Sequence, residues 1–421
     1  MAATGNSIRS LPAALSSLRG RPWLIIAVVI TLGAVLETVA RLDRFLPPVG
    51  AGFIALGLAA LLLHGLRPHQ FRTPIDLAVW ASVLAGILAF VINSHGGSRL
   101  VAYAVVALFF YLSVGVQRAW QPGRVVVSLG AATAVAITAG WAVIQAVFDI
   151  DTGYCRARIE GGADGCFRDD TAIRVTGTFS NPNLLAPVLI LLIPVGCVAL
   201  RMAFGKKWGR ILAAGLGLLG ASALMLTLSR GGLVSMVVLC LAALALKNPS
   251  RRILVGTGLA VAAGIMVAFG TLLAKFSIGP RQDVYRESLE LAREHPWGLG
   301  LGRSGPFLDQ RIPGDQRFFH SHNLWLTWWV ETGFLGLFAA FWLTVAITVV
   351  IIRGARRRDA LVVAAGSGLA GFGVISLFDN PSFDTHVSLA LWTVLSIAVS
   401  ARHRRPPRVP PDGDEPSTLS P

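Results

Sequence analysis

Apolar residues occur along this chain in long runs rather than in short alternating groups. Between Trp23 and Ala401 the runs recur at about 17 to 25 residues, the length that an α-helix needs to cross a bilayer. We therefore predict an all-α integral membrane protein with about twelve transmembrane helices. The expected spans are 23–40, 49–66, 75–92, 100–116, 125–148, 184–204, 209–228, 231–247, 253–275, 323–352, 360–378 and 386–402.

The composition agrees with this fold class. Of the 421 residues, 54% are hydrophobic and only 14% are charged, against about 25% charged residues in a water-soluble domain. We expect one membrane domain at 23–402 between two cytoplasmic tails, 1–22 and a Pro-rich, disordered 403–421. The basic start resembles a signal peptide, but no small-residue cleavage site follows it, so the first helix is predicted to be uncleaved.

Basic residues account for the net charge of +15, and they cluster in every second connection between the apolar runs. This pattern sets the orientation of a membrane protein, and it places both termini in the cytoplasm. It also excludes nucleic acid as the partner, because the charge is not gathered on one face. Two long connections, 149–183 and 276–322, then fall on the extracytoplasmic side, where their length suggests a function.

The second long connection contains the segment DVYRESLELAREH, whose apolar and charged positions separate at helical spacing. The predicted apolar face consists of Val284, Ser288, Leu289 and Ala292. We expect a short amphipathic helix on the outer membrane surface, ended by Pro296.

A glycine motif in the same connection has the spacing of a dinucleotide-binding loop. GLGLGRSG contains Gly300, Gly302 and Gly305 in the order G-x-G-x-x-G. Such a loop needs a strand before it and a helix after it, and no βαβ pattern surrounds this one. We therefore expect a flexible turn that lines a groove, and no nucleotide cofactor.

The four cysteines fall into two pairs of different character. Cys155 and Cys166 lie in the first long connection, where an oxidising compartment makes them candidates for a disulfide. Cys197 and Cys240 lie within apolar runs and are expected to pack there. No group of residues has the spacing of a metal site, so no metal is predicted.

A single arginine interrupts the apolar pattern in LTLSRGGLVS. Arg230 stands between two spans with almost no connection, close to the hydrocarbon on the outer side. Charged groups at this depth usually pair or bind something. An arginine that extends its side chain to water is the alternative.

The segment FFHSHNLWLTWWVETGFLG places two histidines at the start of the tenth span. The span from Asn323 to Ile352 is about 30 residues, or about 45 Å, against a bilayer core of about 30 Å. The first turns should therefore lie in the outer interface, with Trp325, Trp328 and Trp329 as anchors.

His322 is expected at or just before the N-terminus of this helix. The positive end of the helix dipole favours a neutral imidazole there, the form that accepts a proton as a general base. A capping or interfacial histidine is the alternative. Together with several outer arginines, the preferred ligands of phosphate oxygens, this site suits a lipid-linked phosphate or pyrophosphate.

Four segments resemble, in order, those of the O-antigen ligase and polymerase superfamily: RVTGTFSNPNLLAP, LSRGGLVS, RQDVYRESLELAREHPWGLGLG and HNLWLTWWVETGFLG. The last has the family's pattern of His, Asn, nine residues and Gly-x-x-Gly, here His322, Asn323, Gly333 and Gly336. The resemblance covers about 174 to 340.

The resemblance implies a glycosyltransferase that uses neither a metal nor a nucleotide donor. The family transfers a glycan from undecaprenyl pyrophosphate to an acceptor hydroxyl, on a glycan or glycolipid, at the outer face of the bacterial inner membrane. His322 would be the general base, and Arg230 and Arg281 would hold the pyrophosphate. Single displacement implies inversion at the anomeric carbon.

Further residues become candidates for substrate binding through the resemblance: Arg286, His320, Asn323, Glu331, Asn181, Asn183 and Arg303. Many relatives have Trp where this chain has Tyr285, which leaves the choice between Arg281 and Arg286 open. Ligase and polymerase activities stay unseparated. A transporter or flippase is the alternative function, although transporters place coupling charges near the bilayer midplane, where this chain is apolar.

Overall fold

The computed structural model describes residues 15–40, 50–156, 172–247, 256, 279–313 and 317–401. Its α-helices are α2 (Pro22–Ala40), α3 (Ala51–Leu63), α4 (Asp76–Asn93), α5 (Gly97–Ala119), α6 (Gly123–Val147), α7 (Pro182–Ala203), α8 (Trp208–Leu226), α9 (Arg230–Lys247), α11 (Gly279–Glu294), α12 (Ser304–Arg311), α13 (Leu324–Arg356), α14 (Ala360–Ile375) and α15 (Thr385–Val399). The short elements are the 3₁₀ helices η2 (Pro68–Phe71) and η4 (Pro381–Phe383) and the strands β1 (Cys155–Arg156) and β2 (Ala172–Ile173).

The hydrophobic runs located the helices of the bundle well. Every predicted span except 253–275 coincides with a helix, and that span lies outside the described residues apart from Gly256. Among the described residues, eight helices are long and apolar enough to cross a membrane, while α3, α14 and α15 are shorter. The multi-pass architecture is thus supported, and the count of twelve spans stays a prediction.

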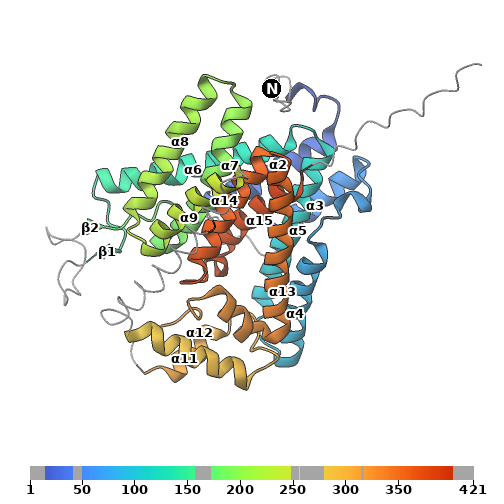
Figure 1. The fold of residues 1–421 in the computed structure, drawn as a ribbon. Helices are drawn as coiled ribbons and strands as arrows, with labels where there is room; N and C mark the ends of the chain where they lie inside the picture. The colour runs from blue at the N-terminus through green and yellow to red at the C-terminus, as the bar shows by residue number, and fades with distance from the viewer. Residues whose placement is uncertain are drawn as a thin grey trace, which may run out of the picture.

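The centre of the bundle is formed by α7 and α15, which neighbouring helices surround (Figure 1). Leu185, Leu189 and Leu192 on α7 are fully buried, and so are Val387 and Ile397 on α15. Protein surrounds both helices, so they lack the one-sided hydrophobic pattern of a surface helix. The buried hydroxyls of Thr393 and Ser396 on α15 donate to carbonyls of their own helix. The bundle gives α15 a rigid base for the loop that precedes it.

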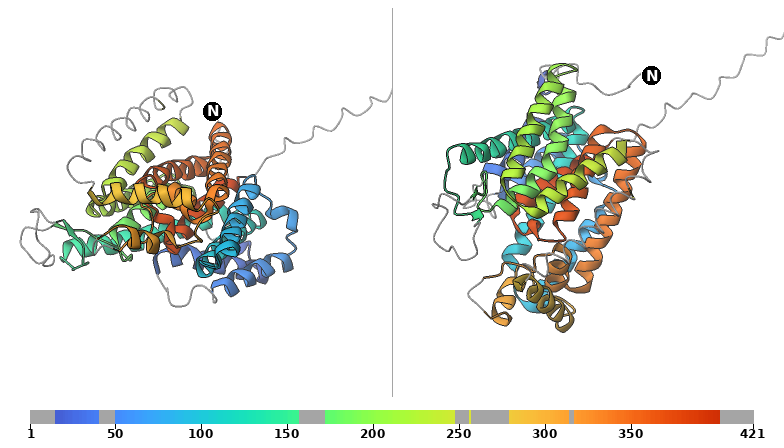
Figure 2. Two further views of the ribbon diagram at one scale, coloured as in Figure 1. Left: turned by 90° about the horizontal axis from the view of Figure 1, so that it is seen from below. Right: turned by 60° about the vertical axis from the view of Figure 1, so that its left-hand side comes forward.

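A small lobe stands apart at one end of the bundle (Figure 1; Figure 2, right). We call it the α11–α12 lobe; it comprises α11, α12 and the first segment of α13. It has its own core, made up of Val284, Leu291, Ala292, Leu299, Leu308, Phe318 and Val330. The second long connection, 276–322, is therefore a packed helical unit over most of its described length.

The amphipathic helix predicted here exists as α11, but its expected apolar face is partly wrong. Val284, Ser288 and Ala292 do share one face, and this face is buried within the protein, whereas Leu289 is 37% exposed and Leu291 takes its place in the core. The buried face packs on α12 and α13. Spacing alone identifies an apolar face, but it does not say whether protein or lipid covers it.

A kink at Gly333 divides α13 into segments 324–332 and 334–356. Gly333 has φ +68° and ψ −164°, and a Cβ atom there would lie 2.3 Å from the carbonyl oxygen of Pro296. Only glycine tolerates this conformation and this contact. The second segment is about 23 residues, or about 35 Å, close to a bilayer core of about 30 Å. The expected excess of length is thus taken up by a separate first segment.

The three tryptophans predicted as interface anchors also make contacts within the protein. Trp325 and Trp328 line an internal cavity, and the ring of Trp328 meets that of Tyr103 edge to face at 5.4 Å. Trp329 packs against the core of the α11–α12 lobe. The first segment of α13 therefore joins the lobe to the bundle.

The described residues of the first long connection, 149–156 and 172–183, pack partly against the bundle. It holds one departure from the all-α prediction, the two-residue antiparallel pair of β1 and β2. After β2 the chain enters the bundle, where the side chain of Gln145 accepts hydrogen bonds from the N–H groups of Thr176 (3.0 Å) and Gly177 (2.9 Å). This buried amide accepts from backbone N–H groups that would otherwise be buried without a hydrogen-bond partner.

Candidate active site

Two histidines and an aspartate form a compact cluster between the bundle and the α11–α12 lobe. Oδ1 of Asp379 lies 3.4 Å from both His320 Nε2 and His322 Nδ1. The same oxygen accepts a 2.8 Å hydrogen bond from the N–H of Asn380. The side chains of His320, His322 and Asp379 are 12%, 30% and 19% exposed. His322 is thus the most accessible member of this group, the reactive cluster.

The backbone around His322 is strained and held from two sides. His322 has φ +48°, a left-handed conformation that is rare for a residue with a side chain. The hydroxyl of Tyr285 on α11 donates to its carbonyl oxygen at 3.2 Å. On the other side, the N–H of Leu324 donates to the carbonyl of Ser376 at 2.9 Å. The lobe and the C-terminus of α14 together set the position of the histidine.

Asn323 is the N-cap of α13, so His322 directly precedes the helix, as predicted. The Asn323 side chain accepts a hydrogen bond from the N–H of Leu326 (3.0 Å). It also donates to the carbonyl of Leu377 (3.0 Å), close in the chain to Asp379. Asn323 therefore supports the site by capping the helix and by tying it to the loop that carries the aspartate.

The hydrogen bonds of His320 define its tautomer. The backbone N–H of His322 donates to His320 Nδ1 at 3.1 Å, so Nδ1 carries the lone pair. A neutral imidazole has one N–H and one lone pair, and the proton must therefore be on Nε2, facing Asp379. His320 acts as a hydrogen-bond donor to the aspartate.

The same three residues have the types and spacing of metal ligands. Their nearest ligand atoms lie within 4.8 Å of one another. Sequence spacing did not reveal this grouping, because Asp379 lies 57 residues after His322. However, His320 would have to bind a metal through Nε2, which carries a proton in the arrangement described. A metal would thus require the bond from the His322 N–H to break, and the geometry fits a hydrogen-bonded cluster better.

Asp379 is suited to orient His322 as a base. Burial by itself raises the pKa of Asp379, but the hydrogen bond from His322 and the electrostatic effect of the two neighbouring histidines outweigh it and lower this pKa. The aspartate is therefore ionised at neutral pH and attracts the proton of His322 to Nδ1. Nε2 of His322 is then the lone-pair nitrogen, as a general base requires.

Arg230, the first residue of α9, is exposed and begins its helix beside this cluster. A Cβ atom on the adjacent Gly231 would lie 3.4 Å from Ile375. The carbonyl of Ile375 in turn accepts a hydrogen bond from the N–H of Asp379 (3.1 Å). The start of α9 and the turn that carries Asp379 are therefore neighbours.

Arg281 and Arg286 are the two candidates on α11 for binding the pyrophosphate, and they occupy different faces of that helix. Arg281 is four residues before Tyr285, which places the two positions on one helix face, the face that reaches His322. The side chain of Arg286 is 66% exposed and lies 3.6 Å from Asp283 and 3.5 Å from Glu287. The side chain of Arg281 lies outside the described part of the structure, so the choice between the two arginines stays a prediction.

Glu331 organises the glycine-rich loop. Its buried carboxylate accepts hydrogen bonds from the N–H of Gly302 (2.7 Å) and from the hydroxyl of Ser304 (2.6 Å), which begins α12. The sequence proposed Glu331 as a substrate-binding residue, and its hydrogen bonds among the described residues go to this loop. It also lines the cavity described below.

The glycines of the loop permit close contacts between backbones. Gly298, Gly300 and Gly302 all have positive φ. A Cβ atom would lie 2.5 Å from the carbonyl oxygen of Glu331 at Gly298, and 2.6 Å from that of His95 at Gly300. Tertiary packing thus accounts for glycine at these positions.

Three other predicted binding residues have local contacts in the part of the chain that is described. Asn181 caps α7 by accepting from the N–H of Asn183 (2.8 Å), and Asn183 accepts from Arg174 (3.0 Å). Arg303 precedes α12 with its guanidinium 5.8 Å from the ring centre of Phe307. These contacts order the segments around the site.

The predicted disulfide lies outside the described residues, because Cys166 and the side chain of Cys155 are not described. Cys197 on α7 and Cys240 on α9 are free thiols. Cys197 is partly buried, in agreement with the expected packing, whereas Cys240 is exposed in the structure and its expected packing is wrong.

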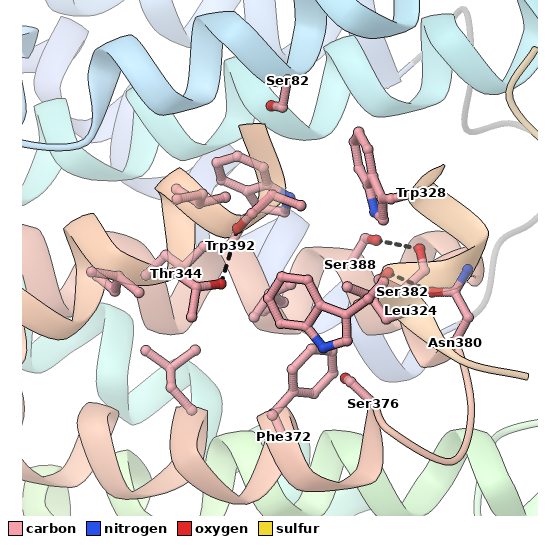
Figure 3. Close-up of a pocket in the computed structure, with 18 of the residues that line it drawn as sticks. Ser82, Leu324, Trp328, Thr344, Phe372, Ser376, Asn380, Ser382, Ser388 and Trp392 are labelled. Atoms are coloured by element: carbon pink, nitrogen blue, oxygen red, sulfur yellow. Dashed lines mark hydrogen bonds between the residues drawn. The ribbon is translucent and has the colours of Figure 1, made fainter. Parts of the chain in front are cut away.

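An elongated cavity of about 520 Å³ opens beside the reactive cluster, between α13, α14, α15 and α5. Its walls are mostly apolar, and Figure 3 shows Trp328, Trp392 and Phe372 around it, with Asn380 and Ser382 at one end. Arg99 lines this polar end and stacks on Phe383 at 3.9 Å from the ring centre.

Sequence reasoning missed two residues of this region, Asp379 and Arg99. Both lie in short connections poor in basic residues, 378–385 and 93–99, which were used only to set the orientation. Charged residues at the ends of spans on the same side as His322 were the available signal. Only the packing of α5 on α15, and of α15 on α13, brings them to the site.

Comparison with known proteins gives one match. Residues 215–341 match the family model described as O-antigen ligase. No curated protein matches the chain. The matched residues include Arg230, Arg281 and His322, and end before Asp379. The resemblance inferred from the sequence motifs is confirmed.

Proposed function

We propose that this protein, whose residues 215–341 belong to the O-antigen ligase family, is a membrane glycosyltransferase that uses a lipid-pyrophosphate donor. The glycan would pass from undecaprenyl pyrophosphate to an acceptor hydroxyl at the outer face of the bacterial cytoplasmic membrane. The contact of His322 with Asp379, 3.4 Å apart beside the matched segment, carries the proposal. It pairs a base with the group that orients it.

The reaction is a single displacement. Nε2 of His322 takes the proton of the acceptor hydroxyl while its oxygen attacks the anomeric carbon of the donor glycan. The bond between that carbon and the pyrophosphate oxygen breaks, and the lipid pyrophosphate leaves with the electron pair. Asp379 stabilises the imidazolium that forms, and the configuration of the carbon inverts.

Arginines take the part that metal ions play in other transferases. Negative charge grows on the leaving pyrophosphate, and Arg230 and Arg281 are the candidates to stabilise it. The position of Arg230 beside the turn of Asp379, and of Arg281 on the Tyr285 face of α11, support this assignment.

A reconstituted assay tests the function. The purified protein is given undecaprenyl-pyrophosphate oligosaccharide and a panel of acceptors, and the products are separated by mass. We expect glycan transfer by the wild type and none above background by His322→Ala. A glycolipid acceptor would identify a ligase, and extension of the donor glycan a polymerase. Lipid movement across vesicles without any transfer would support the flippase instead.

A further inference from the structure

We propose that the cavity beside the reactive cluster binds the isoprenoid chain of the donor, and that Arg99 binds its pyrophosphate at the cavity mouth. The identity of the head group rests on the proposed function. The binding site itself rests on the shape and charge of the cavity.

The cavity has the form and chemistry of a site for one long hydrocarbon chain. It follows α13 from Leu324 to Ile352, and it continues along α14 and along α15 as far as Leu395. On α13 this stretch corresponds to about 42 Å of helix. Leu343, Ile347 and other apolar side chains line it over most of this length. An apolar chain gains free energy by leaving water for such a surface.

Charge is concentrated at one end of this cavity. Arg99 is the one basic residue among those that line it in the described part of the chain. Its Nη1 donates to the backbone carbonyl of Phe383 at 3.0 Å, and its guanidinium stacks on the aromatic ring of the same residue. Its aliphatic stem packs against Gly302, where a Cβ atom would lie 2.8 Å away. The cation is thus held in position yet exposed, as a phosphate-binding group should be.

The mouth of the cavity adjoins the reactive cluster directly. Arg99 stacks on the ring of Phe383, and the centre of this ring lies 5.4 Å from that of His320. Asn380 lines the cavity and donates its N–H to Asp379. A pyrophosphate at Arg99 would therefore present its bond to the glycan near His322. This orientation favours an isoprenoid pyrophosphate over a bilayer phospholipid as the occupant.

Binding can be measured separately from catalysis through tryptophan fluorescence, because Trp328 and Trp392 line the cavity. The protein in detergent is titrated with undecaprenyl pyrophosphate and, separately, with undecaprenol. Arg99→Ala should weaken binding of the pyrophosphate about tenfold, or about 1.4 kcal/mol, and leave undecaprenol unchanged. Arg293→Ala removes an exposed charge from α11 and serves as the control.

A steric variant tests whether the chain occupies the cavity. Gly373 lines it, and a Cβ atom there would meet nothing within 4 Å. Gly373→Phe should therefore fill the cavity without a clash and abolish saturable binding of both lipids. Gly215 on α8 is equally open and lies outside the cavity lining, so Gly215→Phe is the matched control and should bind like the wild type.

The outcomes separate this inference from the proposed function. Unchanged binding in Arg99→Ala, or equal competition by phosphatidylglycerol, would overturn the inference even if glycan transfer occurs. Binding that follows the predictions without transfer to any acceptor would leave it standing and remove the proposed function. Thermal unfolding checks the fold of Gly373→Phe, and the Arg99→Ala arm decides alone if that variant is unstable.

Discussion

Two clusters of histidine and carboxylate lie at the two ends of the short loop between α14 and α15, and their ratios of histidine to carboxylate are opposite. The reactive cluster has one aspartate between two histidines. The second, which we call the buried cluster, has one histidine between two carboxylates. His386 Nδ1 lies 3.3 Å from Asp384 and its Nε2 lies 3.7 Å from Glu37. The side chain of His386 is only 5% exposed.

The proportions and the exposure explain why one cluster suits chemistry and the other suits structure. Both ring nitrogens of His386 face carboxylates, so neither can receive a proton from a substrate. The cluster instead joins α2 to the start of α15. In His322 only Nδ1 faces a carboxylate, and the ring is 30% exposed beside the cavity. The chemistry of a histidine is thus set by its partners, which local sequence does not reveal.

The largest expected difference between the clusters is in catalysis. His322→Ala should lower turnover about a thousandfold, because it removes the general base. His386→Ala should keep turnover per folded molecule within about threefold, since a histidine enclosed by carboxylates takes no part in proton transfer. Initial rates of glycan transfer measure both. Comparable losses in the two variants would contradict the assignment of separate functions.

The carboxylates should differ in the same direction, though less strongly. Asp379→Asn keeps the shape but loses the charge that orients His322, and we expect kcat to fall about 10- to 100-fold with KM little changed. Asp384→Asn is the matched control, because asparagine also caps α15 and can accept from the N–H groups of His386 and Val387. A loss confined to KM in Asp379→Asn would indicate substrate binding instead.

Both clusters contain an ionised aspartate, so both should lose stability at low pH. The pKa of Asp379 is lowered, and so is that of Asp384, where the hydrogen bond from His386 overcomes the effect of burial. Their stabilisation is therefore complete above the ordinary aspartate pKa of about 4 and is lost as pH falls through the lower folded value. The Tm of wild type should approach that of each Asn variant between about pH 5 and 3. A constant difference would argue against ionised carboxylates.

The smallest expected effect is that of metal chelation. Because His320 Nε2 carries the proton in the hydrogen-bonded cluster, removal of divalent metals should change turnover less than about twofold. Turnover after EDTA treatment and dialysis, with and without added Zn²⁺ or Mg²⁺, measures this. If EDTA abolished activity and an added metal restored it, the reactive cluster would have to be assigned as a metal site.

The helices were predictable because membrane spans depend on local composition. The runs located α4, α5 and α6 within a few residues, since length and hydrophobicity along the chain are sufficient for such elements. The surroundings of each apolar face were not predictable. Leu289 was expected on the apolar face of α11 but is 37% exposed, and Trp328 was expected as an interface anchor but lines the cavity. Lipid and protein interiors are similarly apolar, so hydrophobicity does not distinguish them.

The candidate site likewise has a part that the sequence predicted and a part that only the structure revealed. The motif around His322 is contiguous, and its glycines mark the kink at Gly333, so the sequence by itself determined the candidate base, its place at a helix start and the family resemblance of residues 215–341. Only the tertiary structure added Asp379 and Arg99, and only it separated the reactive from the buried cluster. The physical reason is that pKa, tautomer and access depend on contacts between α5, α13 and α15. Those contacts join residues far apart in the chain, and no local pattern encodes them.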